Sequence, residues 1–311
     1  MGNLEKLRHA AQTGALLVCG DELGTLTVRG KDRQTWLDGL VTCQLKGKRS
    51  GDGAYGLVVT KSGKVQAELW VVLGDDLLFV GVDAQRVAGV LETFDRHLIM
   101  EDAELADASG ELAWLFAHGP LAPELAGVAR GAGAHAAPVD RTGRGGLAVV
   151  APRASLAAVE AALVAHAPDR VAAASADAWR ALAVELFVPR FGVDFDDQVY
   201  PQEAALEEAG VSFSKGCYLG QEAVYMLQAR GHVKRRLVQL RVDGLADLEP
   251  GAAVADEDGA VGQVTSATPA GDGSSTFALA YVKYKHARLG ATLSVGGRAA
   301  RVVVGLAAST S

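Results

Sequence analysis

Two strand-like runs joined by only four residues constrain the fold of this chain more than any other feature. Residues 55–60 and 65–73 are rich in β-branched and aromatic side chains, and residues 61–64, of sequence KSGK, connect them. Antiparallel strands can be joined by so short a turn, whereas parallel strands need a crossover of about a dozen residues. The runs therefore predict a β-hairpin and argue against a purely parallel sheet.

Helix-like and strand-like patterns alternate over the first half of the chain. Apolar residues spaced for one buried helix face predict helices over residues 31–41, 84–97, 120–129 and 155–166. Apolar runs predict further strands over residues 23–28, 77–82, 112–117 and 147–151. Sheets that contain hairpins and carry helices indicate the α+β class rather than a doubly wound parallel sheet.

The chain changes character after Arg236. Six short strand candidates, separated by turns rich in glycine and aspartate, fill residues 237–311. That pattern is typical of a small all-β barrel or sandwich. Because 311 residues exceed what one hydrophobic core usually serves, we expect three domains: residues 1–110, residues 111–236 and residues 237–311.

Composition argues against several classes of protein. The net charge of −7 argues against non-specific nucleic-acid binding, because such binding needs a basic face. No apolar run approaches the roughly 18 residues of a membrane span, and the N-terminal region is too charged for a secretory signal. The three cysteines, Cys19, Cys43 and Cys217, have no CxxC spacing and predict neither a disulfide framework nor an intrinsic metal site. We expect a cytoplasmic protein with no membrane partner, with Cys19 and Cys43 in its core.

Residues 51–56 match the GxGxxG pattern of dinucleotide-binding proteins. A nucleotide site requires a strand before this pattern and a helix after it, whereas here a lysine-rich loop precedes it and a strand follows. We therefore interpret these glycines as the flexible start of a strand.

One cysteine stands in a setting that changes thiol chemistry. Within residues 214–222, of sequence SKGCYLGQE, Lys215 precedes Cys217 by two residues and a helix is expected from Gln221. A nearby cation or helix N-terminus favours the reactive thiolate, whereas an ordinary free cysteine is a small buried hydrophobe. The flanking residues favour the functional interpretation of Cys217.

Two further features are candidates for binding a small molecule. Glu185 lies on the apolar face of a helix expected from about residue 175, which indicates either a structural ion pair or helix end, or a carboxylate that binds a ligand such as an aminopyrimidine edge. Residues 230–236 hold five basic side chains in seven, which fits a solvated hairpin and a polyanion or carboxylate site equally well. Between them, Pro201 predicts a short helix that ends at Gly210.

These motifs together resemble the folate-binding YgfZ family, which is related to the glycine-cleavage T-protein, an aminomethyltransferase. The resemblance covers nearly the whole chain, and its most specific part is the Lys-Gly-Cys-Tyr block. The matching segments are Gly30–Arg33, Trp36–Thr42, Lys61–Val65, Glu185, Pro189–Asp194, Pro201–Ala204, Lys215–Tyr218, Gly220–Glu222 and Arg230–Val233. The family implies a three-domain cloverleaf around a central folate channel, built from two sheet-plus-helix units and a C-terminal β-barrel.

The resemblance also implies roles for individual residues in binding tetrahydrofolate. Glu185 would hold the pterin ring, and Arg235 would meet the glutamate tail. Glu68 stands where T-proteins carry the aspartate that acts on folate, with a side chain one methylene longer. Tyr218, from the Lys-Gly-Cys-Tyr block, completes the candidate cofactor-binding set.

The family implies a tetrahydrofolate-dependent accessory role in assembling or repairing the iron–sulfur clusters of client enzymes. Cys217 and Lys215 match the motif residues needed for that activity, with folate and the client enzymes or assembly proteins as partners. Two alternatives stay open. One is a one-carbon transferase like the aminomethyltransferases, which Glu68 favours and the motif cysteine disfavours; the other is a pure interaction scaffold.

Overall fold

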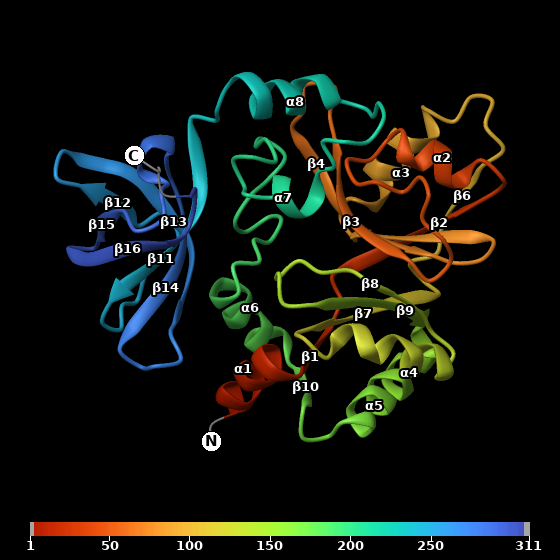
Figure 1. The fold of residues 1–311 in the computed structure, drawn as a ribbon, viewed down its shortest axis with the longest axis horizontal. Coiled ribbons are helices and arrows are strands. Elements are labelled where there is room, and N and C mark those ends of the chain that lie inside the picture. Colours follow the sequence, from red (N-terminus) through yellow and green to blue (C-terminus); the bar gives the residue numbers. More distant parts are fainter. Residues whose placement is uncertain (1–2, 308–311) are drawn as a thin grey trace. The chain divides into compact units, whose positions relative to one another are not determined.

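The computed structural model describes residues 3–307, and the chain divides into two compact units. Unit 1 comprises the residues up to Ala176 together with Ala209–Gln221, and unit 2 comprises Asp177–Glu208 together with the residues from Glu222 onward. Figure 1 traces the chain through both units. Within the described residues, every helix is too short or too polar to cross a bilayer.

The first sheet of unit 1 has the strand order β3-β4-β5-β2-β6, with antiparallel neighbours throughout. The strands are β2 (Leu23–Arg29), β3 (Gly53–Val59), β4 (Val65–Leu73), β5 (Leu77–Asp83) and β6 (Glu104–Asp107). β3 and β4 form the expected hairpin, which places Tyr55 opposite Trp70 and Leu57 opposite Glu68. The helices α2 (Arg33–Asp38) and α3 (Val87–Asp95) bury their apolar side chains against this sheet.

The second sheet of unit 1 has the order β10-β1-β7-β9-β8. Its strands are β1 (Ala15–Cys19), β7 (Leu112–His118), β8 (His135–Pro138), β9 (Gly146–Pro152) and β10 (Val171–Ala174). The strand β1 follows α1 (Asn3–Thr13), runs parallel to β10 and is antiparallel to β7. The apolar core of this sheet includes residues from the short helix η1 (Ala122–Leu125), α4 (Ala126–Gly131) and α5 (Leu156–His166), the last preceded by η2 (Arg153–Ser155). The N-terminal segment therefore completes a sheet whose other strands lie about a hundred or more residues later.

The two sheets of unit 1 contact each other through an aromatic layer. The strand β4 lies against β8 and β9, and β2 lies against β7. The ring centroid of Trp70 lies 5.5 Å from the ring centroid of Tyr55 and 5.5 Å from that of Phe116. Trp114 fits beside Gly81, where a Cβ atom would lie only 2.8 Å from the indole ring. The side chains between the sheets thus come from both sheets.

Unit 2 contains a closed six-stranded barrel, in the order β11-β14-β13-β12-β15-β16. The strands are β11 (Arg235–Asp243), β12 (Ala253–Asp256), β13 (Gly259–Pro269), β14 (Ser275–Lys283), β15 (Thr292–Val295) and β16 (Arg298–Val304), with η3 (Tyr284–His286) after β14. Valine, leucine and alanine side chains fill its interior. The chain between the second sheet and the barrel forms α6 (Ala176–Glu185), α7 (Glu207–Gly210) and α8 (Gln221–Arg230). The predicted α+β class and C-terminal β-barrel are confirmed.

Local differences from the sequence-based expectations have clear physical causes. Gly53 begins strand β3, and no helix follows, so the glycines of residues 51–56 are the start of a strand as expected. The helix expected up to Gly210 is wrong over most of its length, because Ala205 adopts a φ of 57°, which a right-handed helix cannot contain. Cys43 is buried as expected, but Cys19 is exposed at the end of β1, where its thiol donates to Asp21. The division into three domains remains a prediction.

Candidate functional site

Lys215 is buried in unit 1, and its ammonium group binds the main chain at the end of α2 and just after it. Its Nζ donates to the carbonyl oxygens of Asp38, Val41 and Cys43 at 2.5, 2.8 and 2.7 Å. The Asp38 carboxylate lies 3.3 Å from the same nitrogen. An ammonium group has three N–H donors, so these carbonyls use all of them. Burial lowers the pKa of Lys215, and Asp38 opposes that shift.

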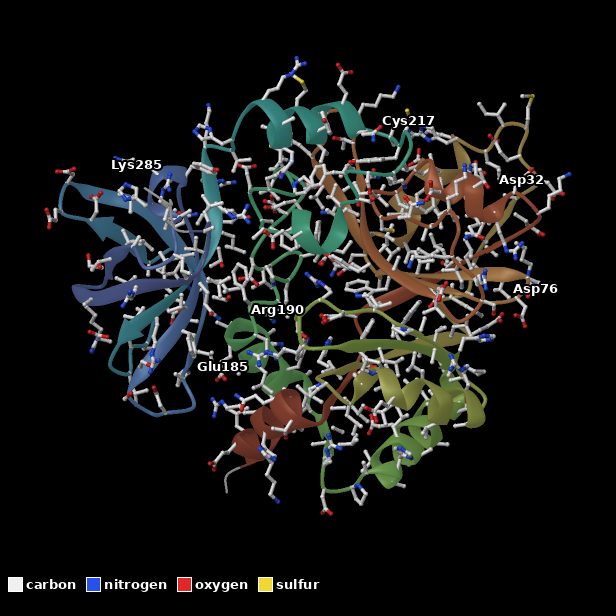
Figure 2. All side chains as sticks on the ribbon, in the orientation of Figure 1. Asp32, Asp76, Glu185, Arg190, Cys217 and Lys285 are labelled. Atoms are coloured by element: carbon white, nitrogen blue, oxygen red, sulfur yellow. The ribbon has the colours of Figure 1, made fainter. Side chains whose placement is uncertain are left out.

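The loop that Lys215 anchors presents Cys217 to solvent. Figure 2 labels Cys217 in this loop, ahead of α8. Farther along, the amide of Leu219 donates to the carbonyl of Gly39 at 3.1 Å. Gly220 has a φ of 77°, and a Cβ atom there would lie 2.2 Å from the carbonyl oxygen of Thr60. The loop is therefore held against the rest of unit 1 on both sides of the exposed thiol.

The charge of Lys215 acts on Cys43, the buried cysteine whose carbonyl it binds. Burial raises the pKa of the Cys43 thiol to about 12, although Lys215 opposes the shift. Tyr218 is also buried, with its ring centroid 5.4 Å from Lys215 Nζ, and burial raises its pKa to about 12. The hydrogen bonds of Lys215 thus organise the loop that carries Cys217, whereas the sequence predicted that Lys215 would act on that thiol.

A buried ion pair lies in the aromatic layer of unit 1. Arg141 Nη1 lies 2.9 Å from Oε1 of Glu68, and both side chains are less than a tenth exposed. The hydroxyl of Tyr55 donates to the same oxygen at 2.6 Å. The guanidinium carbon of Arg141 lies 4.4 Å from the ring centroid of Tyr55 and 5.8 Å from that of Trp70, within the range of cation–π attraction. The candidate carboxylate Glu68 is therefore paired within the chain.

Sequence reasoning identified Glu68 but missed the groups around it. The hairpin register held a usable signal, since Tyr55 and Trp70 lie opposite each other and side chains two residues apart share a face of the strand. Arg141 gave no such signal, because it belongs to a glycine-rich loop between β8 and β9. Its position depends on the packing of one sheet on the other.

His118 at the end of β7 lies in the same interior, stacked on Phe116 with ring centroids 6.4 Å apart. Burial, together with the charge of Arg141, lowers the pKa of His118 to about 4. The imidazole is therefore neutral in the folded protein at neutral pH.

We expect His118 to make folding stability depend on pH between about 6.5 and 4. In this window the unfolded chain binds the proton more readily than the folded protein does. The contribution of neutral His118 to the free energy of unfolding is therefore fully present above the window and is lost as pH falls through it. The difference between the two pKa values corresponds to about 3 kcal/mol. Urea unfolding at pH 7 and pH 4.5 should show a smaller loss for His118→Gln than for the wild type. An equal loss in both proteins would contradict this assignment.

In unit 2, Glu185 is the last residue of α6 and is half-buried. Gln239 of β11 donates through Nε2 to the carbonyl oxygens of Val184 at 2.5 Å and Glu185 at 3.0 Å. These carbonyls belong to the helix end, where intrahelical partners are missing. The barrel strand therefore fixes the main chain that carries the candidate pterin-binding carboxylate, which Figure 2 labels.

The basic cluster before the barrel separates into an exposed arginine and a buried one. Arg235 is 43% exposed in its side chain, lies 3.4 Å from the Glu203 carboxylate and stacks over Tyr281 at 4.5 Å. Arg236 is buried and donates to the Glu207 carboxylate at 2.5 Å. Of these two arginines, Arg235 is the one whose guanidinium an external ligand can reach.

The turn that follows α6 is anchored on the barrel by Asp194. The buried carboxylate accepts hydrogen bonds from the hydroxyl groups of Thr265 at 2.7 Å and Ser266 at 2.6 Å. Its other oxygen accepts the amide of Arg190 at 3.0 Å. This part of the matching motif thus has a structural role within unit 2, which the sequence did not reveal.

Comparison with known families finds two matching domains. Residues 6–132 match the GCVT N-terminal domain, and residues 235–308 match the glycine cleavage T-protein C-terminal barrel domain. The glycine cleavage system aminomethyltransferase T of Bartonella henselae superposes with a TM-score of 0.77 at 19% identity, covering 97% of this chain and 88% of that one. That structure shares the fold.

Curated relatives include transferases and YgfZ proteins. A putative chloroplastic transferase of Arabidopsis thaliana is 23% identical over 94% of this chain and 71% of its own length. An aminomethyltransferase of Geobacillus kaustophilus is 26% identical over 96% of this chain and 88% of its own. A tRNA-modifying protein YgfZ of Yersinia enterocolitica is 39% identical, over 25% of this chain and 24% of its own length. The chain therefore carries the GCVT N-terminal domain and the glycine cleavage T-protein C-terminal barrel domain, in an aminomethyltransferase-like fold.

Proposed function

We propose that this protein binds tetrahydrofolate through unit 2 and assists the assembly or repair of iron–sulfur clusters in client enzymes. The observation that carries the folate part is the arrangement on β11. Gln239 holds the helix end at Glu185, and Arg235 lies four residues earlier on the same face of the strand. The two strand positions are about 13 Å apart. This spacing suits a ligand with an aminopyrimidine edge at one end and carboxylates at the other.

The side chains fit the chemistry of such a ligand. A carboxylate such as that of Glu185 can accept two parallel N–H bonds from a pterin edge. Arg235 can bind a carboxylate tail through two N–H donors, and its stacking on Tyr281 orients the guanidinium plane. Bound tetrahydrofolate would supply a reduced pterin that carries one-carbon groups. The two glycine cleavage T-protein domains support folate as the ligand class.

The iron–sulfur part rests on Cys217 and on the resemblance to YgfZ. The thiol is exposed on a loop that Lys215 fixes in place, where a thiolate can ligate a metal centre in transit or react with an electrophile. The relatives named YgfZ are described as tRNA-modifying proteins. Because the chain has a net charge of −7, we propose that it contacts client enzymes or assembly proteins rather than RNA. We propose a cytoplasmic location, because the sparse cysteines without CxxC spacing fit a reducing compartment.

A one-carbon transferase is the second candidate function, because aminomethyltransferases align with most of the chain. In that reaction Glu68 would have to act on folate. Its carboxylate is instead bound by Arg141 and Tyr55, which disfavours this candidate. Formation of methylene-tetrahydrofolate from an aminomethyl donor would favour it.

We expect Glu185→Ala to weaken tetrahydrofolate binding about 100-fold, because two charge-assisted hydrogen bonds contribute about 3 kcal/mol. Isothermal calorimetry with the wild type and the variant measures the loss. Glu208→Ala removes an exposed carboxylate of the same unit and should bind as the wild type does. No binding by the wild type, or equal binding by Glu185→Ala, would contradict the folate proposal.

The cluster proposal is tested in a strain that lacks its own copy of this protein. We expect Cys217→Ser to fail to restore the activity of an iron–sulfur enzyme, whereas Cys19→Ser, which removes the other exposed thiol, should restore it. If Cys217→Ser restored full activity of the iron–sulfur enzyme, the thiol of Cys217 would have no part in the function, and folate binding alone would remain as the proposal.

A further inference from the structure

We propose that Tyr55, Glu68 and Trp70 form a binding cage for a planar group with an N–C–N donor edge, and that Arg141 occupies this cage as a plug from the same chain. A carboxylate beside aromatic ring faces is the set of groups that recognises guanidinium-like ligands. Arg141 makes both kinds of contact, with Glu68 through Nη1 and with the Tyr55 ring through its face. A free ligand with the same edge would make the same contacts.

The cage is built by the hairpin of β3 and β4. Tyr55 and Trp70 are directly opposite, and Glu68 lies two residues from Trp70 on the same face. The Tyr55 hydroxyl donates to Oε1 of Glu68, which fixes the carboxylate against the ring. All three groups therefore belong to rigid sheet elements, and they do not need Arg141 to come together.

The plug comes from the loop between β8 and β9, and hydrogen bonds within that loop fix its conformation. The Asp140 carboxylate accepts the amides of Thr142 at 2.8 Å, Gly143 at 3.1 Å and Gly145 at 2.8 Å. Gly143 and Gly145 have positive φ values of 68° and 102°, which glycine adopts without strain. The loop is thus a compact segment that carries one arginine, Arg141, into the cage and leaves another, Arg144, exposed.

A cavity beside the plug gives a ligand room to approach. It has a volume of about 310 Å³, and its lining includes Tyr55, Asp140, Cys43, Lys48 and Ser212. Tyr55 is one wall of the cage and Asp140 directly precedes Arg141, whereas Glu68, Trp70 and Arg141 do not line this cavity, so the plug must move before a ligand there reaches Glu68. A ligand that enters there competes with Arg141 for Glu68, and the apparent affinity is lowered by the small fraction of molecules with an open cage.

Removing the plug is expected to raise the affinity of the cage at least about tenfold. The probes are methylguanidinium, a free cation, and isocytosine, which presents the same edge on a neutral ring. Calorimetry and tryptophan fluorescence compare the wild type, Arg141→Ala, and the control Arg144→Ala, which should behave as the wild type does. Adding Glu68→Gln to Arg141→Ala should abolish the gain. The probe whose binding tightens identifies the ligand class as cationic or ring-borne.

A second measurement uses the wild type alone, in case Arg141→Ala does not fold. Trypsin must extract the Arg141 side chain to cleave after it, whereas Arg144 is exposed already. A probe that displaces the plug should raise the rate of cleavage after Arg141 several-fold relative to cleavage after Arg144. The proposal is overturned if neither probe binds Arg141→Ala more tightly than wild type, or if Glu68→Gln leaves the gain intact. If the variant does not fold, an unchanged cleavage ratio overturns it.

The outcome can be separated from the folate proposal, because that proposal rests on Glu185 in unit 2, although the family resemblance also gives Glu68 a role toward folate. Glu185→Ala should leave probe binding to Arg141→Ala unchanged. Loss of folate binding in Glu185→Ala with an intact cage response would support both proposals. A cage response without any folate binding would support the plug alone.

Discussion

Replacing Lys215 with methionine should lower the free energy of unfolding by about 3–5 kcal/mol, the usual result of removing one partner from a buried ion pair. Methionine fills a similar volume but donates no hydrogen bond. The Asp38 carboxylate would lose its cation, and the carbonyls of Asp38, Val41 and Cys43 would lose the donor that binds them. Urea unfolding followed by circular dichroism measures the loss.

Lys61→Met is the matched control, because Lys61 is an exposed lysine in the hairpin of the same unit. Its effect should stay within about 0.5 kcal/mol. A loss below 1 kcal/mol for Lys215→Met would mean that the hydrogen bonds of Lys215 contribute little to stability. A functional role of this lysine would then have to be chemical rather than structural. The expected large loss would instead support a structural role for Lys215, which holds the loop that carries Cys217.

Replacing Arg236 with methionine should cost a similar amount, about 3–5 kcal/mol. Arg236 donates to Glu207 inside unit 2, and burial raises the pKa of Glu207 even though Arg236 opposes the shift. Without the arginine, the carboxylate remains buried and loses its counter-charge. The free energy of unfolding from denaturant titration tests this expectation.

The double variant Arg236→Met with Glu207→Leu shows whether the single variant is destabilised by the unpaired charge of Glu207 or by lost packing of the Arg236 side chain. Removing both charges should recover most of the stability, because no unpaired charge stays buried. Arg235→Met, at the neighbouring exposed position, should cost under about 1 kcal/mol. A double variant as unstable as Arg236→Met alone would show that the arginine stabilises by packing.

The elements that the sequence predicted are those with local signals. The hairpin of β3 and β4 and the strands of the barrel follow from alternating runs with short turns between them. The pairing of β1 with β10 joins Ala15 to Val171, and nothing near either residue specifies that partner. The helix expected before Gly210 failed because one residue, Ala205, takes a left-handed conformation that its alanine side chain does not announce.

The candidate site shows the same division. Glu185, Lys215 and Cys217 stand in recognisable motifs, so the sequence identified them as candidates. Their partners were invisible, because Lys215 binds carbonyls 172 to 177 residues earlier in the chain. Motif spacing therefore located the residues, while their roles depended on tertiary packing.

The closed barrel has a consequence for shortened forms of this protein. The strand β11 pairs with both β14 and β16, and β15 pairs with both β12 and β16. A protein cut before Arg298 would lose β16 and expose two unpaired strand edges at once. Such edges recruit strands from other molecules. Clipping by proteases at the last strand should therefore produce aggregates rather than a smaller soluble fragment, and affinity tags belong beyond Leu306, whose main chain still bonds to Ala287 and Leu289.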